Sequence, residues 1–342
     1  MTDSDQNRDQ HARAMTARKI ELVVWDHQRE LIGALVGAAA RSHGNQPVSE
    51  DWFRWKFSES PYGPSIVVIG LAGDEIAGMV AFGRQEVLLG NSVLSAALSY
   101  ETFVVPEFRG EGLFSRLLEE AMREMRRSGV EVAFNFPNAA SLRGFVKQGW
   151  QQIDSVPLLV KPTNAIRMAR WGSHLLRRQR FIPTRGTSDN SIALPPRLRN
   201  PSPLPSARAL TPHRTAEYLR WRLSARSGLD YRVYDVGDCA AVVRVGQRGK
   251  LREAQLLDLV ADAAGDHTAI QRMVKTIKDS VRPDFMSYRC SKGHPLWEWL
   301  RLCGFVTLPN RSNCTVVAID PRFDAYMAPE GWVFSTLDFH TY

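Results

Sequence analysis

The stretch Ser99-Tyr-Glu-Thr-Phe-Val-Val-Pro-Glu-Phe-Arg-Gly-Glu-Gly-Leu-Phe-Ser-Arg-Leu-Leu118 decides the fold of this chain. Its first part is rich in β-branched and aromatic residues and predicts a buried strand, which ends at Pro106 because proline cannot donate to a β-ladder. Gly110 and Gly112 then predict a turn, and apolar residues at helical spacing from Leu113 onward predict an amphipathic helix. Glycines let backbone amides approach an anion, and a helix N-terminus adds unpaired N–H groups and the positive end of its dipole. The sequence therefore predicts a strand, a turn and a helix with a phosphate site in the turn.

Residues 105–114 resemble the acyl-CoA-binding motif of the GCN5-related N-acetyltransferase (GNAT) superfamily, Arg/Gln-x-x-Gly-x-Gly/Ala. Arg109 and Gly112 match this motif, whereas Phe114 stands where the family has Gly or Ala. The resemblance implies that acetyl-CoA, or another acyl-CoA, is the cofactor. Its pyrophosphate would rest on the turn formed by Arg109, Gly110, Glu111, Gly112, Leu113 and Phe114. An ordinary turn without a ligand is the alternative interpretation.

The same resemblance implies how the rest of the cofactor lies. The pantetheine arm would pair as an extra strand with the backbone of Phe103 and Val105, with Val104 in the same site. Asn138 would contact the pantetheine arm, and Ser141 belongs to the same predicted cofactor site. These two residues open a segment, Asn138-Ala-Ala-Ser-Leu-Arg-Gly-Phe-Val-Lys-Gln-Gly-Trp150, that is similar to the family's Asn-x-x-Ala/Ser…Tyr-x-Lys-x-Gly-Phe ending.

The order of predicted elements in the first half is the GNAT order over about residues 19–160. A strand near residues 20–24 is followed by helices at about 26–41 and around Trp52, and then by strands at 65–71 and 75–82. A strand at 130–136 follows the cofactor helix. We therefore expect an α/β (α+β) fold in which a mixed central sheet is flanked by helices. Residues 1–18 are polar and are predicted to be a disordered N-terminus.

The second half resembles a repeat of the first. The run Glu217-Tyr-Leu-Arg-Trp-Arg-Leu223 echoes Asp51-Trp-Phe-Arg-Trp-Lys-Phe57, 166 residues earlier, and the strands predicted at 231–236 and 241–245 keep the same offset. The corresponding turn, residues 261–267, lacks the motif and carries two carboxylates, which oppose anion binding. We expect residues 209–342 to form a degenerate GNAT-like domain that shapes the substrate side, with one working cofactor site in residues 19–160. An unrelated α+β domain is the alternative.

The net charge of +8 is concentrated in one segment. Residues 161–208 contain ten basic residues and a single acid, together with a run of prolines, which is typical of a linker. A solvated connector is one interpretation, and a positive rim that steers an anionic cofactor is the other. Few aromatic residues lie among these arginines, so we expect no nucleic-acid partner.

Length and composition limit the class of protein. A chain of 342 residues is long enough for two domains. It has no run of eighteen apolar residues and begins with a polar, mixed-charge segment, so we expect a cytoplasmic protein with no membrane partner. The four cysteines show no metal-ligand spacing, so we expect reduced, mostly buried thiols and no metal. The oligomeric state stays open, with a homodimer as one option.

The catalytic residues are less clear from the sequence than the cofactor turn. Many family members have a general-acid tyrosine where this chain has Phe145, and phenylalanine has no proton to give. Tyr100 is the nearest alternative acid, although a phenol on a core strand is commonly a packing residue. Glu101 shares a face of the strand with Phe103 and is the candidate general base, because a carboxylate in an apolar strand needs a partner or a function. A structural ion pair is the alternative for Glu101.

The C-terminal residues 331–342 supply candidate substrate ligands, Asp338 and His340, which could contact an amine or a sugar. A strand with a solvated end is the alternative interpretation. Together these features predict an N-acyltransferase that acts on the primary amine of a small molecule, such as an amino sugar or its nucleotide-linked form. Transfer to a protein, aminoacyl or antibiotic amine, and non-catalytic acyl-CoA binding, are the alternative functions.

Overall fold

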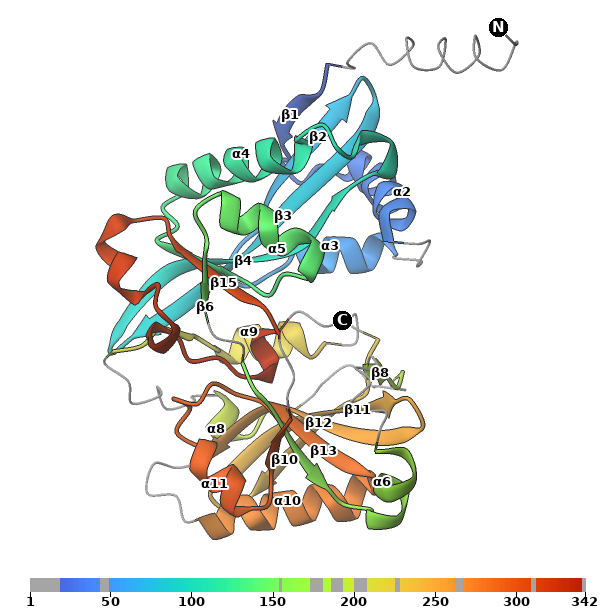
Figure 1. Ribbon diagram of the computed structural model, residues 1–342, viewed down its shortest axis with the longest axis vertical. Helices are drawn as coiled ribbons and strands as arrows, with labels where there is room; N and C mark the ends of the chain where they lie inside the picture. The colour runs from blue at the N-terminus through green and yellow to red at the C-terminus, as the bar shows by residue number, and fades with distance from the viewer. Residues whose placement is uncertain are drawn as a thin grey trace, which may run out of the picture.

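The computed structural model describes residues 19–43, 49–153, 156–172, 181–185, 193–199, 208–224, 228–261, 267–308 and 312–339. The described chain forms two mixed β-sheets, one in the upper and one in the lower half of Figure 1. The predicted N-terminal segment 1–18 and most of residues 173–207 in the predicted linker lie outside the described residues.

The first sheet has the strand order β1-β2-β3-β4-β5-β15-β6, and β9 pairs with β3 beside this path. Among the described strands of this sheet, β4 and β5 are the one parallel pair of neighbours. Its strands are β1 (Glu21–Val24), β2 (Ile66–Ala72), β3 (Glu75–Leu89), β4 (Ser92–Val104), β5 (Val132–Asn135), β6 (Gln151–Ile153), β9 (Thr211–Pro212) and β15 (Cys314–Ala318). The helices of this half are η1 (Arg29–Leu31), α2 (Ile32–His43), α3 (Glu50–Ser58), η2 (Pro106–Phe108), α4 (Leu113–Arg127) and α5 (Ala139–Lys147).

The apolar face of α4 explains why this helix packs on the sheet. It buries the predicted residues Leu113, Leu117, Leu118, Ala121 and Met122, and in addition Met125. These side chains recur at helical spacing and cover β2 and β3. The packing fixes the N-terminus of α4 directly after the end of β4, which is where the predicted phosphate turn lies.

The second sheet has the order β10-β11-β12-β13-β7-β14, with β8 paired to β11. Here too one pair of the strands that the structure describes is parallel, β12 and β13. The strands are β7 (Leu158–Pro162), β8 (Phe181–Pro183), β10 (Tyr231–Val236), β11 (Cys239–Arg248), β12 (Leu251–Ala261), β13 (Phe285–Arg289) and β14 (Val306–Leu308). The helices are α6 (Ala165–Trp171), α8 (Pro196–Arg199), α9 (Ala216–Arg222), α10 (His267–Val281), α11 (Trp297–Leu302), η4 (Pro321–Tyr326), η5 (Pro329–Gly331) and η6 (Thr336–Asp338).

The two sheets have the same architecture, but in each the inserted strand next to the last comes from the other half of the chain. Reading from β2 and from β10, each sheet has three antiparallel strands, a parallel neighbour, an inserted strand and a short edge strand. The inserted strand of the first sheet is β15, from the C-terminal half, and that of the second is β7, from the N-terminal half. In Figure 1, orange-red β15 lies in the blue-green sheet and green β7 lies in the orange sheet. The predicted fold class, two mixed sheets each flanked by helices, is confirmed.

The repeated tryptophan motif joins the two halves. The Trp55 and Trp221 rings, one on α3 and one on α9, stack with centroids 5.0 Å apart. The indole N–H of Trp55 donates to the carbonyl oxygen of Trp221, and that of Trp221 donates to the carbonyl oxygen of Trp55, both at 3.1 Å. The 166-residue sequence repeat therefore corresponds to a reciprocal contact between equivalent helices.

Several predicted boundaries shift in the structure. The helix expected at 26–41 consists of η1 followed by α2, which extends to His43. The expected strand 241–245 is longer, because β11 runs from Cys239 to Arg248. The turn at 261–267, where the second copy lacks the motif, falls mainly on residues 262–266, which lie outside the described residues.

Candidate active site

The turn after β4 presents unpartnered backbone amides at the N-terminus of α4. Gly110 and Gly112 have φ angles of 89° and 74°, a conformation in which a side chain is strained. Gly112 is the N-cap of α4, and no side chain caps the helix there. Arg109 closes the turn by donating from Nε to the carbonyl oxygen of Val104 at 2.9 Å. A helix N-terminus without a side-chain cap suits an anion such as a pyrophosphate.

A cavity of about 520 Å³ lies against this turn and extends to α5. Its lining includes most of the predicted cofactor residues, namely Phe103, Val104, Arg109, Gly110, Gly112, Leu113, Phe114, Asn138 and Ser141. Atoms placed at the Cβ positions of Gly110 and Gly112 would meet nothing within 4 Å, so the backbone there is open to a ligand. These residues fit the diphosphate and pantetheine arm of an acyl-CoA.

Two of the predicted cofactor residues, Val105 and Glu111, are not among the residues that line this cavity. The Val105 N–H donates to the carbonyl oxygen of Ala77 on β3, and its own carbonyl oxygen accepts from the N–H of Phe108. Both backbone groups of Val105 are thus engaged within the protein. The structure gives no support to strand-like pairing of a cofactor at this residue.

Phe114, the departure from the family motif, is accommodated by a glycine on α5. A Cβ atom at Gly144 would lie 2.2 Å from Cε1 of Phe114, closer than real Cβ contacts occur. The ring also packs edge-on against Phe145, with centroids 5.5 Å apart. Phe114 therefore fills the gap between α4 and α5 beside the cavity, and Gly144 is the residue that makes room for it.

This packing predicts the effect of a single methyl group. Gly144→Ala should push the Phe114 ring toward the cavity and weaken acetyl-CoA binding about tenfold, measured by isothermal titration calorimetry, in line with the typical cost of overpacking. The double variant Gly144→Ala with Phe114→Gly should recover most of that loss, because the ring is then absent. Equal affinity of wild type and Gly144→Ala would contradict the proposed contact.

A second cavity, of about 280 Å³, adjoins the first and opens between β4 and β5. The two strands are paired only from Ala96 to Leu98 and from Val132 to Phe134, and they separate beyond that point. Thr102, Asn138 and Ser141 line both cavities. The carboxylate-bearing and aromatic residues of the second cavity are Tyr100, Glu101, Phe136, Phe145 and Phe339. Its position next to the cofactor cavity makes it the candidate acceptor site.

Asn138 begins α5 rather than presenting its oxygen to the cavity. Its Oδ1 accepts from the N–H groups of Ala140 and Ser141, both at 2.9 Å, and the Ser141 hydroxyl also donates to Asn138. This N-cap holds both residues at the junction of the two cavities.

Tyr100, the candidate general acid, lies in the wall of the second cavity but is bonded toward α3. Its hydroxyl is hydrogen-bonded to the Ser65 hydroxyl and to the carbonyl oxygen of Lys56. Burial raises the pKa of Tyr100 well above its usual value. The ring also fills the space beside Gly83, where a Cβ would lie 2.2 Å from it. These contacts are those of a packing residue with satisfied hydrogen bonds.

Glu101, the candidate base, lines the second cavity and pairs with a buried lysine. Its φ of 49° lies in the left-handed region, at a bulge where β4 gains a residue relative to β3. Its Oε1 accepts from Nζ of Lys56 on α3 at 2.7 Å, and the Lys56 side chain is 1% exposed while that of Glu101 is 28% exposed. The pairing that sequence reasoning kept as an alternative for Glu101 is therefore present, at the edge of the cavity.

Sequence reasoning missed Lys56 and Phe339. Lys56 stands inside the repeated motif around Trp55, at the position that Arg222 occupies in the second copy, so the repeat itself was the available signal. The Phe339 ring stacks on Phe136 with centroids 3.9 Å apart and forms part of the acceptor cavity wall. Its neighbour His340, a predicted substrate ligand, lies outside the described residues.

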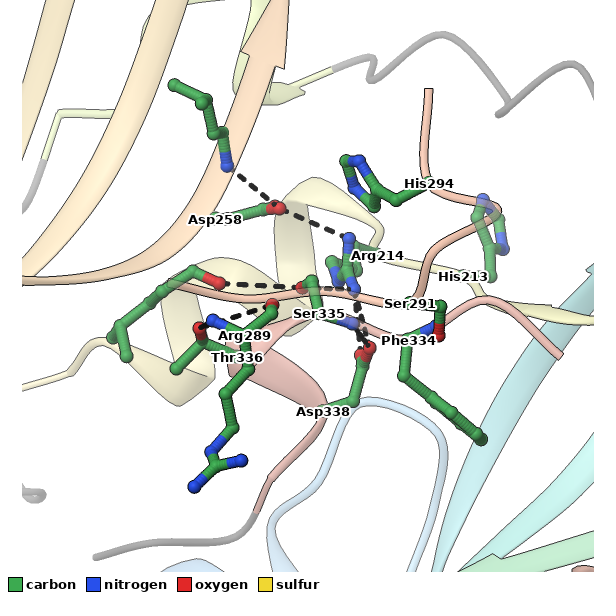
Figure 2. Close-up of polar contacts among 12 residues, drawn as sticks. His213, Arg214, Asp258, Arg289, Ser291, His294, Phe334, Ser335, Thr336 and Asp338 are labelled. Atoms are coloured by element: carbon green, nitrogen blue, oxygen red, sulfur yellow. Dashed lines mark hydrogen bonds and ion pairs between the residues drawn. The ribbon is translucent and has the colours of Figure 1, made fainter. Parts of the chain in front are cut away.

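In the second domain the opening between the parallel strands is filled by the chain's own C-terminal segment. The Ser291 N–H donates to the carbonyl oxygen of Phe334, and the Arg289 N–H donates to the Thr336 hydroxyl. On the other side, the Ser335 hydroxyl donates to the carbonyl oxygen of Leu257 on β12. Figure 2 shows Phe334, Ser335 and Thr336 near Arg289 and Ser291. Residues 334–336 thus bridge β12 and the end of β13, and the single cofactor site in the N-terminal domain stays a prediction.

Asp338, the other predicted substrate ligand, lies in this second-domain network. Its side chain is 3% exposed and contacts Arg214 Nη2 at 2.8 Å, while Arg214 Nη1 binds Asp258 at 3.1 Å (Figure 2). Burial by itself lowers the pKa of Arg214, but the two carboxylates outweigh that effect and hold the pKa above its usual value. Asp338 also accepts from the Ser335 N–H. It is not among the residues that line either cavity, so the structure does not bring it to the candidate acceptor site.

Other predicted features of the chain can be compared with the described residues. The side chains of Cys239, Cys290, Cys303 and Cys314 are buried thiols outside any disulfide, as predicted. The described residues include no cluster of three or more His, Cys, Asp or Glu side chains arranged to hold a metal ion. None of the described helices is both long and apolar enough to cross a membrane.

Comparisons with known proteins agree with this geometry. Residues 38–153 match the family described as acetyltransferase (GNAT) domain. Among solved structures, the GCN5-related N-acetyltransferase from Anabaena variabilis superposes with a TM-score of 0.60 at 13% identity, covering 89% of this chain and 74% of that one. Eis1 from Mycobacterium abscessus gives a TM-score of 0.58 at 13% identity, with coverages of 90% and 75%. A probable N-acyltransferase from Enterococcus faecalis gives 0.59 at 11% identity, with coverages of 88% and 73%. No curated protein sequence matches the chain.

The structural neighbours show the fold, and the matched family covers β4, the phosphate turn, α4 and α5. All the residues that line the two cavities lie within the matched stretch 38–153, apart from Phe339. Residues 38–153 therefore resemble a GNAT acetyltransferase domain, and the chain shares the fold of GNAT N-acetyltransferases, with two sheets of the same architecture.

Proposed function

We propose that this protein transfers the acetyl group of acetyl-CoA to the primary amine of a small molecule by direct attack. The observation that carries the proposal is the junction of two cavities, one at an uncapped helix N-terminus and one beside a carboxylate. The first suits a diphosphate, and the second places Glu101 next to Thr102, Asn138 and Ser141, which both cavities share.

In the proposed reaction the residues of the chain orient two reactants and move one proton. The amides of the turn from Arg109 to Phe114 hold the donor, so that the thioester reaches the junction of the cavities. The amine nitrogen forms a bond to the thioester carbonyl carbon, and the carbon–sulfur bond breaks. Glu101 accepts the proton that the nitrogen loses, directly or through one water, and the leaving thiolate takes a proton from solvent. Tyr100 stays a candidate for that last step only if its present hydrogen bonds rearrange.

The lining of the second cavity favours an acceptor without phosphate groups. Among the described residues that line it, Glu101 carries a negative charge and none is lysine or arginine. A carboxylate attracts an ammonium group and repels a diphosphate. Of the two forms considered, an amino sugar is therefore favoured over its nucleotide-linked form, and the three phenylalanine rings offer an apolar surface for the body of the acceptor.

Thermal unfolding with and without acetyl-CoA tests the donor site. A ligand at one hundred times its Kd should stabilise the wild type by about 2.7 kcal/mol, whereas Gly112→Asp, which puts a carboxylate in the turn, should show no shift. Gly129→Asp is the matched control, since Gly129 has a similar φ of 73° at the other end of α4 and is open to solvent. If Gly112→Asp responds like Gly129→Asp, the turn does not hold the donor.

Acceptor turnover is the second part of the test. Release of the CoA thiol is followed with glucosamine, a uridine diphosphate-linked amino sugar, phenylethylamine and spermidine as acceptors. The proposal expects turnover with at least one phosphate-free amine. Acetyl-CoA binding without turnover on any amine would instead favour a non-catalytic acyl-CoA-binding protein.

A further inference from the structure

Lys56 is a buried cation whose partner is the carboxylate at the edge of the acceptor cavity. Its side chain is 1% exposed, and Nζ lies 2.7 Å from Oε1 of Glu101. Lysines are almost never fully buried unless they are paired, so the ion pair with Glu101 is what compensates the burial of this ammonium. That interaction points toward the candidate acceptor site, because Glu101 lines the cavity and Lys56 does not.

The surroundings of Lys56 are aromatic. Its ammonium lies 4.5 Å from the centroid of the Trp52 ring and 4.9 Å from that of Tyr100. Burial lowers the pKa of Lys56, and the charge and hydrogen bond of Glu101 partly offset this effect. Arg222 is the other charged group whose field acts on Lys56, and it disfavours the protonated form. The charge on Lys56 therefore depends on Glu101.

The backbone conformation of Glu101 is unusual and fixes the direction of its side chain. A glutamate in the left-handed region costs on the order of 1 kcal/mol or more, and such strain persists only where the surrounding structure enforces it. The bulge at this point sets the direction of the side chain relative to the regular β4 ladder. Strand and helix thus converge on one carboxylate, β4 by its bulge and α3 through Lys56.

The second domain holds the helix that carries Lys56. Trp55, the preceding residue, stacks on Trp221 and exchanges two hydrogen bonds with it. Lys56 itself corresponds to Arg222, which is also 1% exposed and donates to the Tyr231 hydroxyl. Each copy therefore keeps a buried cation next to the shared tryptophan contact, and in the N-terminal copy that cation is bonded to the carboxylate of the acceptor cavity.

We propose that Lys56 is a positioning residue, which fixes Oε1 of Glu101 so that the carboxylate faces the amine. Because the second domain holds α3, the helix that carries Lys56, it is thereby coupled to catalysis. This inference rests on the proposed function. In it, Lys56 touches neither reactant. It holds the carboxylate in one orientation and keeps it ionised, so that Glu101 can take the proton of the attacking amine.

The test compares Lys56→Met with Lys147→Met, which removes an exposed lysine at the end of α5. Acetyl-CoA affinity, and kcat and KM for the best amine of the acceptor panel, are measured as a function of pH. We expect Lys56→Met to lower kcat at least tenfold, with the Kd for acetyl-CoA within twofold of wild type. The acid limb of its kcat profile should move to higher pH, because a carboxylate without a neighbouring cation is protonated more easily. Lys147→Met should match the wild type.

Two further variants separate charge from packing. Lys56→Gln keeps an N–H donor without the charge, and it replaces Lys56→Met if that variant does not fold. Lys56→Arg restores the charge and should return the acid limb toward its wild-type position. If Lys56→Met and Lys56→Gln keep the kcat and pH profile of Lys147→Met while Glu101→Gln is impaired, the positioning role is wrong and the proposed function stands. If the wild type binds no acetyl-CoA or acetylates no amine of the panel, the proposed function fails and this inference with it.

Discussion

Glu101→Gln is expected to reduce kcat at least about a hundredfold, the usual range for loss of a general base. The substitution keeps the size of the side chain, and its amide oxygen can still accept from Lys56 Nζ, so the fold and acetyl-CoA affinity should change little. What is lost is the ability to take a proton from the amine. Steady-state release of the CoA thiol with the best acceptor of the panel measures the effect.

The matched control for this variant is Glu298→Gln, which neutralises an exposed carboxylate on α11, outside both cavities, and should leave kcat near the wild-type value. The pH profile gives a second criterion. Raising the pH should not restore the wild-type kcat to Glu101→Gln, because the variant has no group that takes the proton from the amine. A kcat within threefold of wild type near neutral pH would show that Glu101 is not the base, and the ion pair with Lys56 would then be structural.

Asp338→Asn is expected to lower the free energy of unfolding by about 1 to 3 kcal/mol, the cost of weakening charge-assisted hydrogen bonds in a buried network. Arg214 is 10% exposed and binds Asp258 and Asp338 at once, so the variant leaves its charge compensated by one carboxylate instead of two. Denaturant unfolding measures the change. Asp320→Asn is the control, because Asp320 pairs with the largely exposed Arg322 and its loss should have little effect.

The same variant tests how the C-terminal segment contributes to the acceptor site. Asp338 anchors the segment next to Phe339, which stacks on Phe136 in the cavity wall. A loosened segment should raise KM for the amine while the Kd for acetyl-CoA stays within about twofold of the wild-type value, because Phe339 does not line the cofactor cavity. If Asp338→Asn unfolds at the same denaturant concentration as Asp320→Asn, the Arg214 network does not hold the segment in place.

The exchanged strands make the two sheets depend on each other. β15 supplies the first sheet with a strand between β5 and β6, and β7 supplies the second with a strand between β13 and β14. Each sheet would lose a central strand if the halves were separated. Together with the Trp55–Trp221 contact, the exchanged strands tie the two halves of the chain to one another.

Local sequence was sufficient for the phosphate turn, for the face of α4 and for the repeat. Gly110 and Gly112, the proline before them and the apolar spacing after them act within about twenty residues, so their geometry follows from backbone conformation and periodicity alone. The offset between Trp55 and Trp221 likewise needed only the order of residues.

Residues brought together from distant segments could not be found in this way. Lys56 lies 45 residues before Glu101, and Phe339 lies about 200 residues beyond Phe136, so neither contact leaves a local pattern. The ion pair of Asp338 explains why a polar residue near the terminus, expected to reach a substrate, is instead buried against Arg214. Such pairings depend on which surfaces face each other after the sheets have formed.

By itself, the sequence determined the strand, turn and helix of the candidate donor site, because hydrogen-bonding capacity and chain stiffness are local properties. The tertiary structure alone decided which strands the halves exchange, that the second opening is filled by residues 334–338, and that a buried lysine meets the candidate base. Those outcomes follow from burying apolar surface and compensating buried charge across segments far apart in the chain, which no single stretch of sequence encodes.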